Sequence, residues 1–330
     1  MAFIRFHRPW SSFSPCSMPD QPHSPRERVR QVLAGLPTPR PPLGELIIDD
    51  DLVRDLAGLP LDKPLPLAAK RALLKRWGHD LVTVAFSSGW GAPVQPDPKE
   101  RLDRLRFWAE ESDLFLFALV DGPFSMAARA WSWDQALIRF SQRDRELEAF
   151  LADGVIEMSE WFAALADAGA EGIILGDDIA YRRGPYVNPR HLRAAYFPFL
   201  TLVTATAQDL GLAVVFHSDG NLWPVWEDVL QTGVDGIHGL DPYASMSLAL
   251  ARQRSPASLC LWGNLDVGWL MNLPDREQIR AHLATLLGPA LSAPLIFGSS
   301  SGLHAGLPLE ALDALYAEAA AVASLTMDDD

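Results

Sequence analysis

Eight short apolar runs alternate along the sequence with longer amphipathic segments. Each run is six to eight residues long and continuously apolar, which is typical of strands buried on both faces of a parallel sheet. The runs cover residues 43–49, 81–86, 114–121, 172–177, 212–217, 236–241, 259–264 and 295–300. Eight strands that each precede a helix predict an α/β fold of the (β/α)8 TIM-barrel class, built as a single domain.

The segments between the runs carry helix signals. Asn188 followed by Pro189 is an N-cap and first-turn pair, and Pro198 predicts a break or kink in the helix that follows. The longest insertion, residues 122–171, is expected to hold an extra helix at residues 132–142. The rival fold, an open doubly wound sheet, is disfavoured because no glycine fingerprint follows the first run.

Two end segments differ in composition from the region between them. Residues 1–24 are rich in Ser and Pro without steady periodicity, which predicts a disordered tail in which Met18 is a second candidate start. Residues 326–330 include three successive aspartates and predict an acidic, solvated end. Residues 25–325 are expected to form the barrel.

Charge and cysteine content narrow the function classes. The formal net charge of −14 argues against binding of nucleic acid, since contact with phosphates calls for basic patches. No apolar run approaches the roughly 18 residues that a membrane span needs, so no membrane association is expected. Cys16 and Cys260 cannot build a disulfide framework, a pattern consistent with a reducing cytoplasm. We therefore expect a cytoplasmic protein.

Polar side chains collect at the carboxyl ends of the predicted strands, although the strand interiors are apolar. Barrel enzymes carry their chemistry in the loops at these ends, so the pattern predicts an active site in the barrel mouth. The candidate site residues are Trp90, Arg129, Asp177, Asp178, Tyr181, Arg182, His217, Asp219, Asn221, Asp241, Asn264, Ser301 and His304.

The fifth run ends in three polar residues at alternate positions, His217, Asp219 and Asn221. Alternate side chains of a strand point to the same face, so we expect these three to converge. His217 beside Asp219 suits either two metal ligands or an acid/base pair, and a hydrogen bond that merely completes the strand is the alternative. A third metal ligand would have to come from another strand.

Asp178 is assigned to catalysis together with His217 and Asp219, and the remaining candidates are assigned to substrate. Asp177 and Asp178 are adjacent, so only one of them is expected to face the mouth, and the pattern does not choose between them. Arg129 and Arg182 suit a carboxylate or phosphate, and Trp90 suits stacking on a planar ligand. Asp241 and Asn264 either orient substrate or only order their loops. Cys260 lies inside a predicted strand and is therefore a poor metal ligand.

Several stretches of the chain resemble the uroporphyrinogen decarboxylase superfamily. The resemblance runs from about Pro25 over most of the chain and rests on residues 122–127, 177–200, 217–242, 262–267 and 298–319. That superfamily is a (β/α)8 barrel. It contains tetrapyrrole decarboxylases and cobalamin-dependent methyltransferases, which move a methyl group between a corrinoid and a thiol.

This chain departs from both branches. The decarboxylases carry a Met-Arg-Gln-Ala-Gly-Arg stretch after the first strand, where this chain reads IIDDDLVRDLAG. Their catalytic Asp, Tyr and His fall at Ser88, near Arg129 and near Ser301. The methyltransferases hold zinc through a His-x-Cys pair and a later Cys. Here His217 matches, while Asp219 and Ser301 stand at the cysteine positions.

The resemblance implies an enzyme of the methyltransferase-like branch that acts with a corrinoid carrier and has a zinc site at His217 and Asp219. Tetrapyrrole decarboxylation is the alternative, and a tetrapyrrole- or corrinoid-binding barrel without turnover is the third interpretation. The substrate would be a small molecule or a corrinoid protein, and the resemblance allows a homodimer. Asp219 in place of a thiolate makes the site harder and less thiophilic.

Overall fold

The structure, a computed structural model, describes residues 24–60, 62–87, 97–288 and 293–325. Of the tail predicted for residues 1–24, only Ser24 is described, and it caps helix α1 (Pro25–Leu33). The rest of that tail, Trp90 and the acidic end 326–330 lie outside the described residues.

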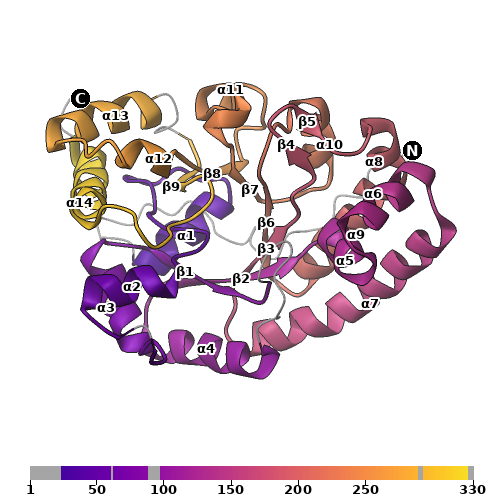
Figure 1. Cartoon of the computed structure of the whole chain (residues 1–330), viewed down its shortest axis with the longest axis horizontal. Helices are drawn as coiled ribbons and strands as arrows, with labels where there is room; N and C mark the ends of the chain where they lie inside the picture. The colour runs from indigo at the N-terminus through magenta and orange to yellow at the C-terminus, as the bar shows by residue number, and fades with distance from the viewer. Residues whose placement is uncertain (1–23, 61, 88–96, 289–292, 326–330) are drawn as a thin grey trace, which may run out of the picture.

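Seven parallel strands form one curled sheet whose order follows the chain. They are β1 (Leu81–Ala85), β2 (Phe115–Asp121), β3 (Gly172–Gly176), β6 (Ala213–Ser218), β7 (Gly236–Gly239), β8 (Cys260–Leu265) and β9 (Leu295–Ser299). The loop after β3 holds a small antiparallel pair, β4 (Ala180–Tyr181) and β5 (Gly184–Pro185). The strand–helix alternation and the curl of the sheet confirm the predicted barrel class (Figure 1).

The prediction of a regular strand at residues 43–49 is wrong. It forms only two isolated bridges, from Leu43 to Phe297 and from Ile48 to Leu303. Carboxylates replace part of its backbone ladder: Glu45 accepts from the Ser299 amide at 2.9 Å, and Asp80 accepts from the Leu43 amide at 2.8 Å. An apolar run could not reveal this, because the substituting carboxylates come partly from elsewhere in the chain.

Most helices surround the sheet on its outer side, whereas α1 packs against the cluster inside the barrel (Figure 1). The helices are α1 (Pro25–Leu33), α2 (Asp50–Ala57), α3 (Leu67–Arg76), α4 (Pro98–Glu111), α5 (Pro123–Trp131), α6 (Trp133–Gln142), α7 (Arg145–Asp167), α8 (Pro189–Ala195), α9 (Phe197–Asp209), α10 (Trp226–Gln231), α11 (Leu248–Gln253), α12 (Val267–Leu270), α13 (Arg276–Leu287) and α14 (Leu309–Leu325), with 3-10 turns η2 (Trp223–Val225) and η3 (Pro242–Ala244). Within the described ranges, none of these helices is both long and apolar enough to cross a bilayer.

Two helix predictions are confirmed. The extra helix expected at residues 132–142 is α6, although the insertion holds three helices, since α5 precedes α6 and α7 follows it. The break expected at Pro198 separates α8 from α9 at Tyr196. Pro198 has no amide hydrogen to donate and so sits where a helix begins, in the first turn of α9.

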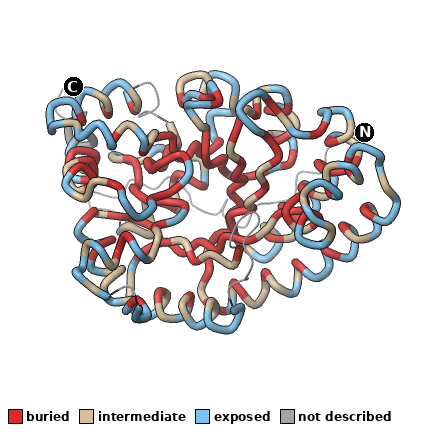
Figure 2. The backbone as a smooth tube through the Cα atoms, in the orientation of Figure 1, coloured by how far each residue is buried: buried red, intermediate tan, exposed pale blue. Residues whose placement is uncertain are grey.

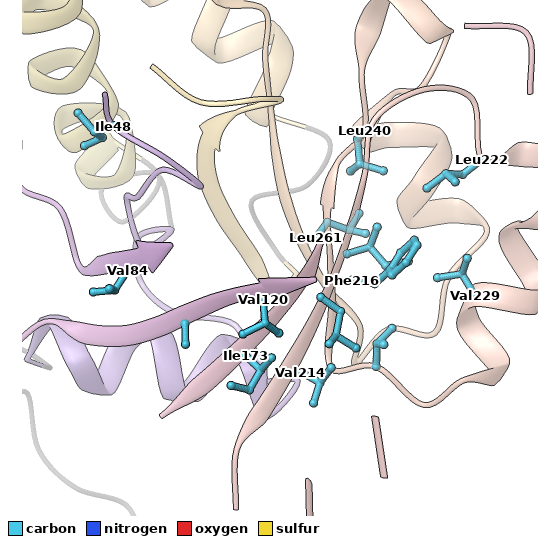
Figure 3. Packing of buried hydrophobic residues seen from close by; sticks show 14 of the residues in the cluster. Ile48, Val84, Val120, Ile173, Val214, Phe216, Leu222, Val229, Leu240 and Leu261 are labelled. Atoms are coloured by element: carbon cyan, nitrogen blue, oxygen red, sulfur yellow. The ribbon is translucent and has the colours of Figure 1, made fainter. Parts of the chain in front are cut away.

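The sheet separates two apolar layers. Val214 and Phe216 of β6 point outward and pack in the large cluster between sheet and helices, together with Val120 and Ile173 (Figure 3). The alternate residue Val215 points inward, into the smaller cluster inside the barrel. The strands are buried while exposure concentrates on the outer helices (Figure 2). The same alternation turns His217 toward the barrel interior.

Candidate functional site

His217 lies at the carboxyl end of β6 and lines a cavity in the barrel mouth. This mouth cavity has a volume of about 170 Å³. Its wall is formed by Leu46, Ile47, Ser87, Leu119, Asp121, Ser125, Arg129, Gly176, Asp178, His217 and Ser301. Polar groups from the ends of five strands, β1, β2, β3, β6 and β9, therefore meet beside the apolar side chains of this cavity.

Asp178, His217 and Asp219 form the centre of the site. One ligand atom of each lies within 4.8 Å of the others. The Nε2 atom of His217 is 3.8 Å from Oδ1 of Asp178, which also accepts a 3.0 Å hydrogen bond from the Asp219 amide. Asp178 follows β3 and supplies the group that the sequence required from a second strand. The three side chains together can hold a cation or move a proton.

The Asp219 carboxylate is only partly satisfied. Its Oδ1 atom is buried and has no hydrogen-bond partner among the described residues. Burial raises the pKa of the Asp219 carboxyl, His217 partly offsets this, and Asp178 and Asp241 add to it. A buried acceptor without a donor is costly, so this oxygen is suited to receive a proton or a cation.

His238 is a site residue to which the sequence pattern assigned no role. It pairs with His217 across the β6–β7 register, and the Nδ1 atoms of the two rings lie 2.8 Å apart. His238 is fully buried, with its ring edge-on to Trp262. Burial and the neighbouring His217 lower the pKa of His238 well below its usual range. His238 is therefore a neutral partner that holds the His217 ring.

The structure separates the two adjacent aspartates. Asp177 is fully buried, and its carboxylate accepts hydrogen bonds from the amides of Phe124 and Ser125 and from the Tyr196 hydroxyl, at 2.7–3.0 Å. Burial raises the pKa of Asp177 to about 7, against those hydrogen bonds. Asp177 thus caps the start of α5, in place of the predicted contact with substrate, and Asp178 is the one that faces the mouth.

Three predicted residues order loops. Asn221 does not converge with His217, because Gly220 takes a φ of 86° and ends the strand alternation; its Oδ1 accepts from the Trp223 amide at 3.0 Å. Asp241 begins η3 by accepting from the Tyr243 amide at 2.8 Å. Asn264 is buried, and its amide donates to the Leu240 carbonyl at 3.0 Å.

The remaining predicted residues lie around the rim. Arg129 lines the mouth cavity, where it forms an ion pair with Asp121 and donates to the Ser87 hydroxyl at 3.0 Å. Tyr181 is exposed on the β4–β5 pair beside the exposed Arg182, and it stacks on Tyr186. These two side chains are not in the mouth cavity.

Ser301 and His304 both follow β9. Ser301 lines the mouth cavity and also a larger cavity beside it, whereas His304 lines only the larger one. The structure therefore brings Asp178, His217, Asp219, Arg129 and Ser301 together at the mouth.

Comparison with known proteins gives the family. The model of the family described as uroporphyrinogen decarboxylase (URO-D) matches residues 99–322, about two thirds of the chain. The chain belongs to the uroporphyrinogen decarboxylase family. This confirms the resemblance seen in the motifs.

Two similar proteins are informative. A uroporphyrinogen decarboxylase from Ralstonia pickettii (strain 12J) is 35% identical over 107 residues, which are 32% of this chain and only 28% of that relative. A methyltransferase from Methanosarcina mazei has 17% sequence identity and a TM-score of 0.73, covering 91% of this chain and 99% of that one. The second likeness shows that the two chains share the fold.

The metal-ligand set of this uroporphyrinogen decarboxylase family member contains no thiolate among the described residues. Cys260 is buried inside β8, where burial raises the pKa of its thiol to about 12. The set of one imidazole and two carboxylates nevertheless suits zinc or another divalent cation of borderline hardness. The buried, unpartnered oxygen of Asp219 fits a cation at this place, so the residues present are compatible with a metal.

Proposed function

We propose that this protein is an enzyme that transfers a methyl group to or from a corrinoid carrier, with its reaction centre at Asp178, His217 and Asp219. The observation that carries the proposal is that the three ligand atoms lie within 4.8 Å of one another, and that two of the residues, Asp178 and His217, line the mouth cavity. The centre occupies the carboxyl ends of β3 and β6, where barrel enzymes keep their chemistry.

Asp178, His217 and Asp219 would hold a divalent cation such as zinc. When bound, the cation supplies Lewis-acid chemistry that lowers the pKa of a coordinated methyl acceptor. Two oxygen ligands make the centre hard, which favours an acceptor other than a thiol. His238 holds the Nδ1 side of the His217 ring, so that Nε2 is directed toward Asp178.

The rest of the mouth cavity orients the substrate. Leu46, Ile47 and Leu119 provide an apolar floor that limits access of water to the reacting atoms. The Arg129 guanidinium, held by Asp121, lines the same cavity and would contact an acidic group of the substrate.

Decarboxylation of a carboxylated tetrapyrrole is the second candidate function. It is favoured by Arg129, which lies in the same cavity as His217 and has the geometry to hold a carboxylate. The partial identity to the Ralstonia pickettii decarboxylase supports it as well. In this case His217 and Asp219 would act as an acid/base pair in place of metal ligands.

The two functions are separated by one set of assays. The purified protein is analysed for metal content and incubated with methylcobalamin and candidate acceptors, with transfer followed by mass spectrometry, and in parallel with uroporphyrinogen. Methyl transfer that His217→Ala abolishes and His191→Ala retains supports the first proposal, since His191 lies on α8 away from the mouth cavity. Consumption of uroporphyrinogen supports the second. Tight corrinoid binding with no turnover of either kind overturns both.

A further inference from the structure

A second cavity of about 490 Å³ adjoins the mouth cavity. Its wall is formed by residues 47–50, by β1, by residues of α3 and α4, and by residues 301–304. Ile47 and Ser301 line both cavities, so the two cavities are neighbours that share these residues as a common wall. We call the larger space the seam cavity, because it lies between residues 47–50 and β1.

The seam exists because the first predicted strand is irregular. Within the described residues, segment 43–49 bridges β9 but forms no bridge with β1. On the β1 side, the Leu43 carbonyl accepts from the Asp80 amide at 2.7 Å and the Leu43 amide donates to the Asp80 carboxylate at 2.8 Å. The Thr83 hydroxyl donates to the Glu45 carbonyl at 3.2 Å. Beyond Thr83 the carboxyl half of β1 borders the cavity.

Three cationic side chains line the seam cavity. Lys70 of α3 donates to the Ile48 carbonyl at 2.8 Å and pairs with Asp50 at 3.1 Å. Arg104 of α4 pairs with Glu100 at 3.0 Å and reaches Asp50 at 3.5 Å. Two of the three cations therefore already have carboxylate partners. Asp49 also lines the cavity, and its carboxylate caps α2 by accepting from the Asp51 amide.

Arg101, the third cation, is different. Across the described part of the chain its guanidinium has no recorded hydrogen bond or ion pair, and its Nε atom is buried without a partner. Burial and the positive charge of Arg104 lower the pKa of Arg101, and the negative charges of Glu100 and Asp50 offset part of this. Arg101 is only half-buried, but its buried Nε donor lacks a partner beside a like charge, and an anion in the cavity would satisfy both.

We propose that the seam cavity binds an oxyanion, a carboxylate or a phosphate, carried on an arm of the molecule whose reacting end lies at His217. Arg101 supplies the planar fork of donors that such groups match, and Arg104 and Lys70 add positive charge from the same wall. The shared residues Ile47 and Ser301 are where the arm passes from one cavity to the other. The inference goes beyond the proposed function, because it does not depend on which reaction takes place at His217.

Calorimetric titration with inorganic phosphate and with glutarate tests the subsite. The titrations compare the unaltered protein with Arg101→Met and with Arg106→Met, a matched control on the exposed face of the same helix, where Arg106 pairs with Asp103. We expect saturable binding of at least one probe, weakened about tenfold or more by Arg101→Met and unchanged by Arg106→Met. The preferred probe identifies the arm as phosphate or carboxylate. Absence of saturable binding, or equal affinities in the two variants, overturns the proposal.

Chemical protection in the unaltered protein avoids dependence on the folding of a variant. Phenylglyoxal modifies arginines, and the extent of modification at each site is read by mass spectrometry with and without the anion. The expected result is that the anion protects Arg101 and leaves Arg106 reactive. Unprotected Arg101 at saturating anion contradicts the subsite. The anion is expected to protect Arg101 in His217→Ala as well. Protection of Arg101 without methyl transfer would therefore contradict the proposed function and leave the anion subsite supported.

Discussion

The Nδ1 atoms of His217 and His238 lie 2.8 Å apart, which is the distance of a hydrogen bond between the two rings. The residues are direct partners in the β6–β7 register, and the backbone pairing therefore sets their separation. His217 turns its other nitrogen, Nε2, toward Asp178 at 3.8 Å. Hydrogen bonding at one imidazole nitrogen orients the other, which makes His238 a positioning residue for the centre.

Replacement of His238 by Phe is expected to weaken binding of zinc about 10- to 100-fold, because His217 loses the partner that orients it. The matched control is His79→Phe. His79 is also fully buried, but neither of its ring nitrogens has a hydrogen-bond partner in the described structure. The measurement is calorimetric titration of metal-free protein with zinc. Equal affinity in the two variants would show that His238 only fills space.

The adjacent aspartates are expected to respond oppositely to substitution by Asn. Asp177→Asn puts an amide N–H₂ in place of one carboxylate oxygen, so at least one of the donors from Phe124, Ser125 and Tyr196 loses its acceptor, and the free energy of unfolding should fall by about 2 kcal/mol. Asp178→Asn keeps the oxygen that accepts from the Asp219 amide, so its stability should stay within about 0.5 kcal/mol while zinc affinity falls. Urea denaturation and zinc titration of both variants check this. A stable Asp177→Asn protein that has lost zinc affinity would reverse our assignment.

Asp219→Cys is expected to change the preference among metals. A thiolate in place of the carboxylate softens the centre, so affinity for zinc should rise relative to manganese. Competition between the two metals, read by elemental analysis after dialysis, measures the ratio. Ser255→Cys, which adds a thiol just after α11 and outside the set Asp178, His217 and Asp219, serves as the control for nonspecific thiol binding. An unchanged ratio in Asp219→Cys would place Asp219 outside the metal site.

Glu45 is expected to make stability depend on pH. Burial raises the pKa of its carboxyl from 4.5 to about 7, in spite of hydrogen bonds from Ser299 and Tyr316. The folded state then holds a proton that the unfolded state releases, so the contribution is complete below about pH 4.5 and is lost as pH rises to about 7. The loss is on the order of 3 kcal/mol.

Glu45→Gln should remove this part of the pH dependence. Urea denaturation at pH 5 and pH 8 gives the change in unfolding free energy for each protein. The decrease in unfolding free energy from pH 5 to pH 8 should be smaller in Glu45→Gln than in the unaltered protein. Part of the decrease should remain, because the pKa of Asp177 is raised as well. Glu111→Gln, at an exposed ion pair with Arg71, should keep the original fall. An identical fall in Glu45→Gln would contradict a protonated Glu45.

Local patterns were sufficient for most of the fold. Burial on both faces leaves a continuous apolar run in each strand, and seven of the eight predicted runs became strands of one parallel sheet. The alternation of side chains along β6 likewise turned His217 toward the barrel interior. That alternation stopped being informative at Gly220, where a positive φ redirected the chain and took Asn221 away.

The sequence by itself determined the barrel class, the family and the location of polar groups at strand ends, because each rests on a short-range pattern or on motifs read along one chain. Only the tertiary structure decided that Asp178 faces the mouth while Asp177 caps α5, that His238 supports His217, and that a seam lies beside β1. These features depend on register between strands and on side chains that are far apart in the sequence. No local periodicity carries this information, because these contacts form only when the strands pair and the sheet curls.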